Sequence, residues 1–199
     1  MAPPMTPAEW RAALRAEGVP ISELGGWTTR GRDAATGKRF GPVRGSLNHH
    51  TAAVNSLNAI AFHGQGPDVP PPLAHAYPPK SGVLVLVAAG RANHAGLAAR
   101  NAWDAIVAEQ PIPRPDKSTG TVDGNDGLYG IETENLGDGR DEYTREQYDT
   151  WVRYNAAICR HHGWGPGAWP GTLRPRSRAS PTRGARSRAT GLAAGSRPP

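Results

Sequence analysis

The chain has 199 residues, of which 37% are hydrophobic, and a formal net charge of +6 at pH 7. This length allows one ordinary domain with its own core plus terminal extensions. No apolar run approaches the roughly 20 residues of a membrane-spanning helix, which excludes a spanning protein. The single cysteine, Cys159, excludes an internal disulfide. Residues 1–4 (MAPP) lack the charged and apolar regions of a secretory leader, so we expect synthesis in the cytosol.

The excess of positive over negative charge is confined to the C-terminal part of the chain. Residues 165–199 hold seven arginines and no acidic residue, whereas residues 1–164 hold 16 basic and 17 acidic residues, a net charge of −1. Of the 35 residues in this tail, 29 are Arg, Pro, Gly, Ala or Ser, so we expect it to be disordered. Its charge could contact nucleic acid without sequence preference, but Trp169 is its only aromatic residue, so nucleic acid is not an expected partner.

Apolar spacing and the positions of Gly and Pro predict strands mixed with helices, and therefore an α/β fold with a sheet covered by helices. Residues 1–44 are expected to form an N-terminal helix and an irregular arm, 45–164 the main domain, and 165–199 the tail. In chain order, the expected elements are a helix at 7–17, a strand at 45–51, a helix at 52–61, a strand at 82–89, a helix at 95–107, a strand at 128–134 and a helix at 144–163.

Two features of the predicted strands carry chemistry. His49 and His50 end the first strand, and because neighbours on a strand face opposite ways, only one of them can point into a given site. The strand at 128–134 (LYGIETE) alternates, so Glu132 and Glu134 share a face and strand geometry alone does not separate them. Without further context, the favoured explanation is structural: one buried and one exposed histidine, and exposed strand carboxylates.

The order of four segments supplies that context. GSLNHHTA at 45–52, LAHAY at 73–77, GRANHAG at 90–96 and GLYGIETENLG at 127–137 together resemble the zinc N-acetylmuramoyl-L-alanine amidases, a family that includes phage endolysins and peptidoglycan recognition proteins. The resemblance covers most of residues 20–164. It implies a central mixed β-sheet flanked by helices, peptidoglycan as the partner, Zn2+ as the cofactor, and hydrolysis of the amide between N-acetylmuramic acid and L-alanine. We further expect a monomer that acts on the cell wall once released, as a phage or prophage lysis enzyme does.

The resemblance also assigns roles to single residues. It places a zinc ligand on His49 and the catalytic carboxylate on Glu132, which would take a proton from zinc-activated water and pass it to the departing amine. His94 and Asn135 match positions that border the substrate groove, and His75 matches a structural histidine.

The chain departs from the family pattern at the C-terminal end. The family draws its other two zinc ligands from a Gly-His pair and a Lys-x-Asp-Pro segment after the long helix, but residues 166–199 contain no His, Cys, Asp, Glu or Lys. A shifted reading of permitted codons for residues 168–183 can spell VAGHLETALPRKSDP, which contains these residues in the family order. We therefore hypothesise a frameshift, and expect weak zinc binding and impaired hydrolysis. A non-catalytic peptidoglycan-binding protein of the same fold is the alternative.

Overall fold

The computed structural model describes residues 2–168. Most of the tail expected to be disordered, from Trp169 onward, lies outside the described residues. The preceding stretch ends in a short 3-10 turn, Pro166–Ala168.

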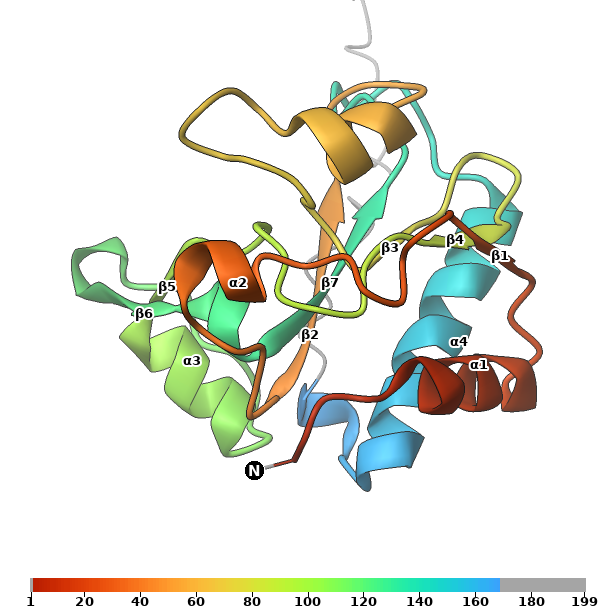
Figure 1. The fold of residues 1–199 in the computed structure, drawn as a ribbon. Coiled ribbons are helices and arrows are strands. Elements are labelled where there is room, and N and C mark those ends of the chain that lie inside the picture. The colour runs from red at the N-terminus through yellow and green to blue at the C-terminus, as the bar shows by residue number, and fades with distance from the viewer. Residues whose placement is uncertain (1, 169–199) are drawn as a thin grey trace, which may run out of the picture.

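A five-stranded mixed sheet forms the centre of the fold, in the order β1-β4-β3-β7-β2. The pairs β1–β4, β3–β7 and β7–β2 are parallel, and β3–β4 is antiparallel. Because β2 and β7 run in the same direction, their C-terminal ends meet at one edge, beneath the helical segment near residue 60 (Figure 1). The strands are β1 (Ile21–Glu23), β2 (Gly45–His50), β3 (Ala76–Tyr77), β4 (Leu84–Leu86) and β7 (Leu128–Thr133). This is the α/β architecture that the sequence predicts.

Two long helices, α1 (Pro7–Ala16) and α4 (Arg145–His162), contact each other beside the sheet (Figure 1). Both begin with a capping box, from Thr6 to Glu9 and from Thr144 to Gln147, in which each side chain bonds the backbone N–H of the other residue. An aromatic cluster fills the space between them, where Trp10 packs on the rings of Tyr129 and Tyr154.

The shorter elements lie around this core. Strands β5 (Leu97–Ala99) and β6 (Gly120–Asp123) form a separate antiparallel pair that contacts helix α3 (Arg100–Val107). The remaining helical segments are α2 (Asp33–Thr36), a π-helix (Ala59–His63) and the 3-10 turns Lys117–Thr119 and Gly124–Asp126.

Three expectations about local structure differ from the fold. The arm expected to be irregular contains β1, which pairs with β4 in the main sheet, and the short helix α2. The first half of the helix expected at 52–61 is replaced by turns, because Ala53 forms a bridge with Asn135, and residues 57–61 are helical. The helix expected at 95–107 begins only at Arg100, because residues 97–99 pair with β6 as a strand.

Candidate functional site

Strands β2 and β7 bring His49 and Glu132 together. The two residues are register partners on adjacent parallel strands, so their side chains leave the same face of the sheet. Thr133, the residue that follows Glu132, faces the other way, because its hydroxyl accepts a 2.5 Å hydrogen bond from Trp151 of α4. Within β7, which ends at Thr133, this agrees with the alternation predicted for residues 128–134.

His94 reaches the same place from a loop. Its Nδ1 lies 3.3 Å from Nε2 of His49, and its Nε2 donates to the backbone carbonyl of Leu128 at 2.9 Å. The ring lies against Gly130, where a Cβ atom would be 2.6 Å from Nδ1 of His94. The absence of a side chain at residue 130 is what lets the imidazole lie flat on strand β7.

The carboxyl group of Glu132 has the properties of a proton-transfer group. Its Oε2 atom is buried and has no hydrogen-bond partner among the described residues. Burial raises the pKa of Glu132 to about 8, so the group is mostly protonated at neutral pH. A carboxyl group with a pKa near the working pH can both release and accept a proton.

Glu134 is held in a different way. It lies just beyond β7, and its carboxylate accepts hydrogen bonds from the hydroxyl of Tyr77 at 2.6 Å and from the backbone N–H of Asn55 at 3.3 Å. Both carboxylate oxygens therefore have a structural partner. The contacts distinguish the two glutamates, because Glu132 keeps a buried oxygen without a hydrogen-bond partner among the described residues, whereas Glu134 does not.

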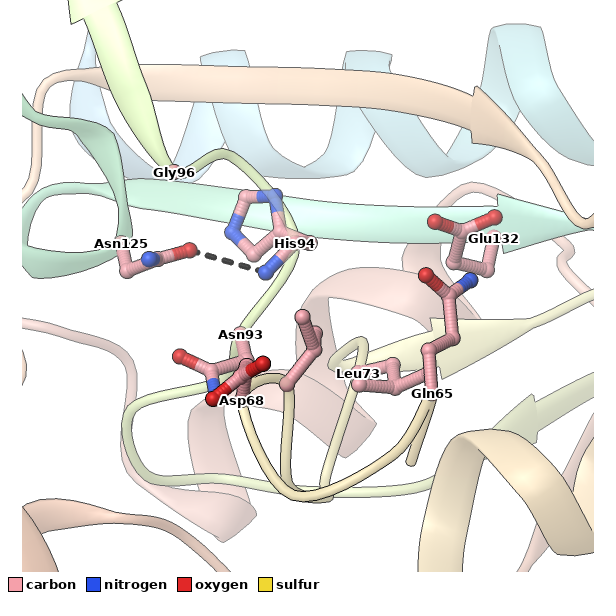
Figure 2. A pocket seen from close by; sticks show the side chains of 9 residues that line it. Gln65, Asp68, Leu73, Asn93, His94, Gly96, Asn125 and Glu132 are labelled. Carbon is pink, nitrogen blue, oxygen red and sulfur yellow. Dashed lines mark hydrogen bonds between the residues drawn. The ribbon is translucent and has the colours of Figure 1, made fainter. Parts of the chain in front are cut away.

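Glu132 and His94 line a cavity of about 280 Å³. Figure 2 shows Glu132 and Gln65 at one end of the cavity, and Asp68, Asn93 and Asn125 at the other. Most of the lining side chains are polar, which suits a ligand rich in amide and hydroxyl groups. The loop at 63–73, expected from its Gly and Pro content, supplies one wall through Gln65, Asp68, Val69 and Leu73.

The histidines of this region are neutral at pH 7. Desolvation lowers the pKa of His49 to about 4 and that of His94 well below the usual value. His75 is fully enclosed, its pKa falls to about 3, and its Nδ1 accepts a hydrogen bond from the backbone N–H of Gly130. The hydrogen bond to the strand is in keeping with the structural role that the sequence suggests for His75.

The other predicted residues lie apart from the cavity. Asn135 is buried, and its side chain donates to the carbonyl of Asp141 and accepts from the N–H of Gly137, so its amide stabilises the loop that follows β7. It is not among the lining residues of this cavity. His50 faces away from His49 and packs against Gly137, as expected for the second histidine of the pair.

The residues present do not fit a zinc centre with three protein ligands. Among residues 2–168, no group of three His, Cys, Asp or Glu side chains is placed to hold a metal ion. His49 and His94 are in contact, and their facing nitrogens share a hydrogen bond rather than converging on a common point. The sequence offers no His, Cys, Asp or Glu after residue 165 to complete the set.

Asn125 and Gly130 are site residues that sequence reasoning missed. Asn125 accepts hydrogen bonds from the backbone N–H groups of His94 and Ala95 and lines the cavity, and Gly130 provides the surface for the His94 ring. The glycine between two apolar residues in LYGIE was a local signal of close approach. Nothing local in the sequence links Asn125 to His94.

A mixed α/β sheet with a buried carboxyl group and imidazoles at one strand edge is an arrangement suited to acid–base hydrolysis. A family model for N-acetylmuramoyl-L-alanine amidase matches residues 39–174, and the chain belongs to this family. No curated protein and no solved structure gives a significant match. Within residues 2–168, no helix is long and apolar enough to cross a membrane.

Proposed function

We propose that the chain binds peptidoglycan in the cavity between Glu132 and Asn125, at the junction of N-acetylmuramic acid and L-alanine, and that its hydrolysis of this bond is impaired. The observation that carries the proposal is the buried carboxyl group of Glu132, which faces a polar cavity and has one oxygen without a partner. Membership of the amidase family indicates the substrate polymer, peptidoglycan, and the bond between N-acetylmuramic acid and L-alanine.

Glu132 is the group that we assign to proton transfer. Because its pKa is raised to about 8, it holds a proton at neutral pH and can donate it to the nitrogen of a departing amine. His94 borders the same cavity, and we keep it as a substrate-contacting residue. The groove-edge role predicted for Asn135 is less supported, because both ends of its amide bond the backbone.

We infer impaired hydrolysis from the number of zinc ligands that the chain offers. The resemblance implies that Zn2+ activates the attacking water in this family, with His49 as one of three ligands. The described residues offer no group of three ligands, and a catalytic zinc site depends on several converging ligands that neighbouring groups orient. We therefore expect weak zinc binding by this chain.

Two proteins test this proposal: the chain as it is, and a version in which the hypothesised reading frame restores VAGHLETALPRKSDP. We expect about one zinc ion per molecule and release of amino groups from purified cell walls with the restored version only. One tightly held zinc per molecule in the present chain would show that its ligand set is complete. Resequencing the gene between the codons for Gly163 and Ala168 tests the frameshift, and a confirmed frame with no inserted or deleted base would end that hypothesis.

The alternative is a non-catalytic peptidoglycan-binding protein. The specific observation in its favour is that the polar cavity is formed although the described residues lack a metal-binding group. Sedimentation of the chain with cell walls, without release of amino groups, would support this alternative. Loss of sedimentation in a Glu132→Gln, Gln65→Ala double variant would locate binding in the cavity.

The biological setting that the resemblance favours is lysis by a phage or prophage enzyme, with peptidoglycan reached after release from the cytosol. We propose that the chain acts there as a monomer. Light scattering of the purified chain, with and without soluble peptidoglycan fragments, tests the oligomeric state, and a stable dimer would contradict this part of the proposal.

A further inference from the structure

His94 is fixed by its backbone as well as by its ring. The side-chain oxygen of Asn125 accepts hydrogen bonds from the N–H groups of His94 and Ala95, both at 2.8 Å. Asn125 is 7% exposed, so water competes little for this oxygen. Figure 2 shows the bond from Asn125 to His94 across one end of the cavity. One amide oxygen thus holds two consecutive residues of the loop.

Two contacts hold the ring of His94 in place. It lies on Gly130, where any side chain would collide with its Cγ atom. At the far side of the ring, Nε2 is 2.9 Å from the carbonyl oxygen of Leu128. A carbonyl oxygen only accepts hydrogen bonds, so Nε2 of His94 carries the proton.

The proton on Nε2 of His94 determines which nitrogen of His49 is protonated. In a neutral imidazole only one nitrogen is protonated, so Nδ1 of His94 has a lone pair and accepts. The group 3.3 Å from it is Nε2 of His49, which must therefore donate. The lone pair of His49 is then on Nδ1, the nitrogen that remains for a ligand or a proton.

We propose that Asn125 is a positioning residue: by fixing the loop that carries His94, it sets the hydrogen bond to His49 and so selects the tautomer in which His49 presents Nδ1. The inference deepens the proposed function in that it treats His49 as a site residue. It concerns the arrangement of the chain's own imidazoles and requires neither bound metal nor hydrolysis.

Nuclear magnetic resonance of the full chain labelled with 15N at histidine tests the proposal at pH 7. We expect His49 and His94 both to be protonated at Nε2 and unprotonated at Nδ1, with the Nε2 proton of His49 protected from exchange with water. Variants His49→Gln and His94→Gln assign the signals. A wild-type His49 protonated at Nδ1, or an unprotected Nε2 proton, would overturn the proposal without any further variant.

Three variants then separate positioning from general packing. Asn125→Leu keeps the approximate volume and removes the accepting oxygen, so exchange of the His49 Nε2 proton should rise by at least about tenfold. Asn125→Asp keeps an acceptor and should restore protection. Asn93→Leu is the matched control, because Asn93 lines the same cavity but donates to the carbonyl of Pro70 instead. Equal loss in Asn125→Leu and Asn93→Leu would contradict a specific role for Asn125.

Gly130→Ala provides an independent check, because it displaces the ring of His94 and leaves Asn125 unchanged. It should abolish the protection of His49 even if Asn125→Leu does not fold. Peptidoglycan sedimentation of the wild type is measured alongside. Protection without peptidoglycan binding would retain this inference and reject the proposed function, whereas binding with an unprotected His49 would do the reverse.

Discussion

The two faces of strand β7 differ in how their polar groups are satisfied. Toward α1 and α4, Tyr129 accepts a hydrogen bond from the N–H of Met5 and contacts Nε2 of His162 at 3.1 Å, and the hydroxyl of Thr133 accepts from Trp151. Toward the cavity, Glu132 has an oxygen without a partner among the described residues. We call the side toward α1 and α4, where these two polar side chains of β7 are paired, the stabilising face; the other side keeps a buried group at a cost to stability, as is common at functional sites.

The largest expected effect tests the stabilising face. Trp10 is 1% exposed and packs on Tyr129 and Tyr154. Trp10→Ala should lower the free energy of unfolding by about 3–5 kcal/mol, because it leaves a cavity between α1 and α4. Urea unfolding measures the change. Leu97→Ala, at a residue that is 70% exposed, is the control and should change stability by less than about 0.5 kcal/mol.

Acid should lower the free energy of unfolding through buried histidines. Burial lowers the pKa of His49 and of His162 to about 4 and that of His75 to about 3, below the value of about 6.5 expected in the unfolded chain. The unfolded state then binds more protons, so stability is fully present above pH 6.5 and is lost as the pH falls toward 4. We expect each ring to contribute a loss of up to about 3 kcal/mol in urea titrations across this range, more in total than the opposing change at Glu132. A flat profile would contradict the burial of these rings.

Glu132 should respond in the opposite sense. Its folded pKa of about 8 exceeds the unfolded value, so its contribution to stability is greatest at low pH and is lost as the pH rises from about 4.5 through 8. At pH 9, Glu132→Gln should therefore raise the free energy of unfolding by about 2 kcal/mol. Glu134→Gln should lower it, because Tyr77 loses a charged acceptor. If both substitutions destabilise equally, the contrast between the two glutamates is wrong.

The smallest effect tests a local feature of the stabilising face. Thr144 caps α4 by accepting from the N–H of Gln147 at 3.1 Å. Thr144→Ala should cost about 1 kcal/mol, measured as a shift of the thermal midpoint. Thr144→Ser keeps the hydroxyl and should recover most of the loss. A larger loss than that of Trp10→Ala would mean that α4, rather than the aromatic cluster, limits stability.

Elements encoded by neighbouring residues were predictable from the sequence. The capping box at Thr144 and the alternation of LYGIE specify α4 and β7 locally, and both were expected. Strand β5 was not, because its pairing depends on residues 120–123, in a stretch that reads as loop. The same holds for residues 52–56, whose backbone follows a bridge to Asn135 instead of the local helical tendency.

The site was predictable to a similar extent. Strand alternation and the family resemblance placed His49 and Glu132 on one face, and the register of β2 and β7 agrees. The environment of Glu132 depends on a loop some 60 residues earlier, and the separation of Glu132 from Glu134 depends on the hydroxyl of Tyr77. Such long-range contacts have no local pattern, so spacing alone left the two carboxylates equivalent.

The position of β2 at the end of the strand order has a practical consequence. Among the described residues, β2 pairs with β7 on one side and has no neighbouring strand on the other. An edge strand of this kind has unpaired backbone groups to which another extended segment can bind. Since β2 also carries His49, concentrated samples that self-associate through this edge would show the change first at that imidazole, which makes its resonance an early indicator of aggregation.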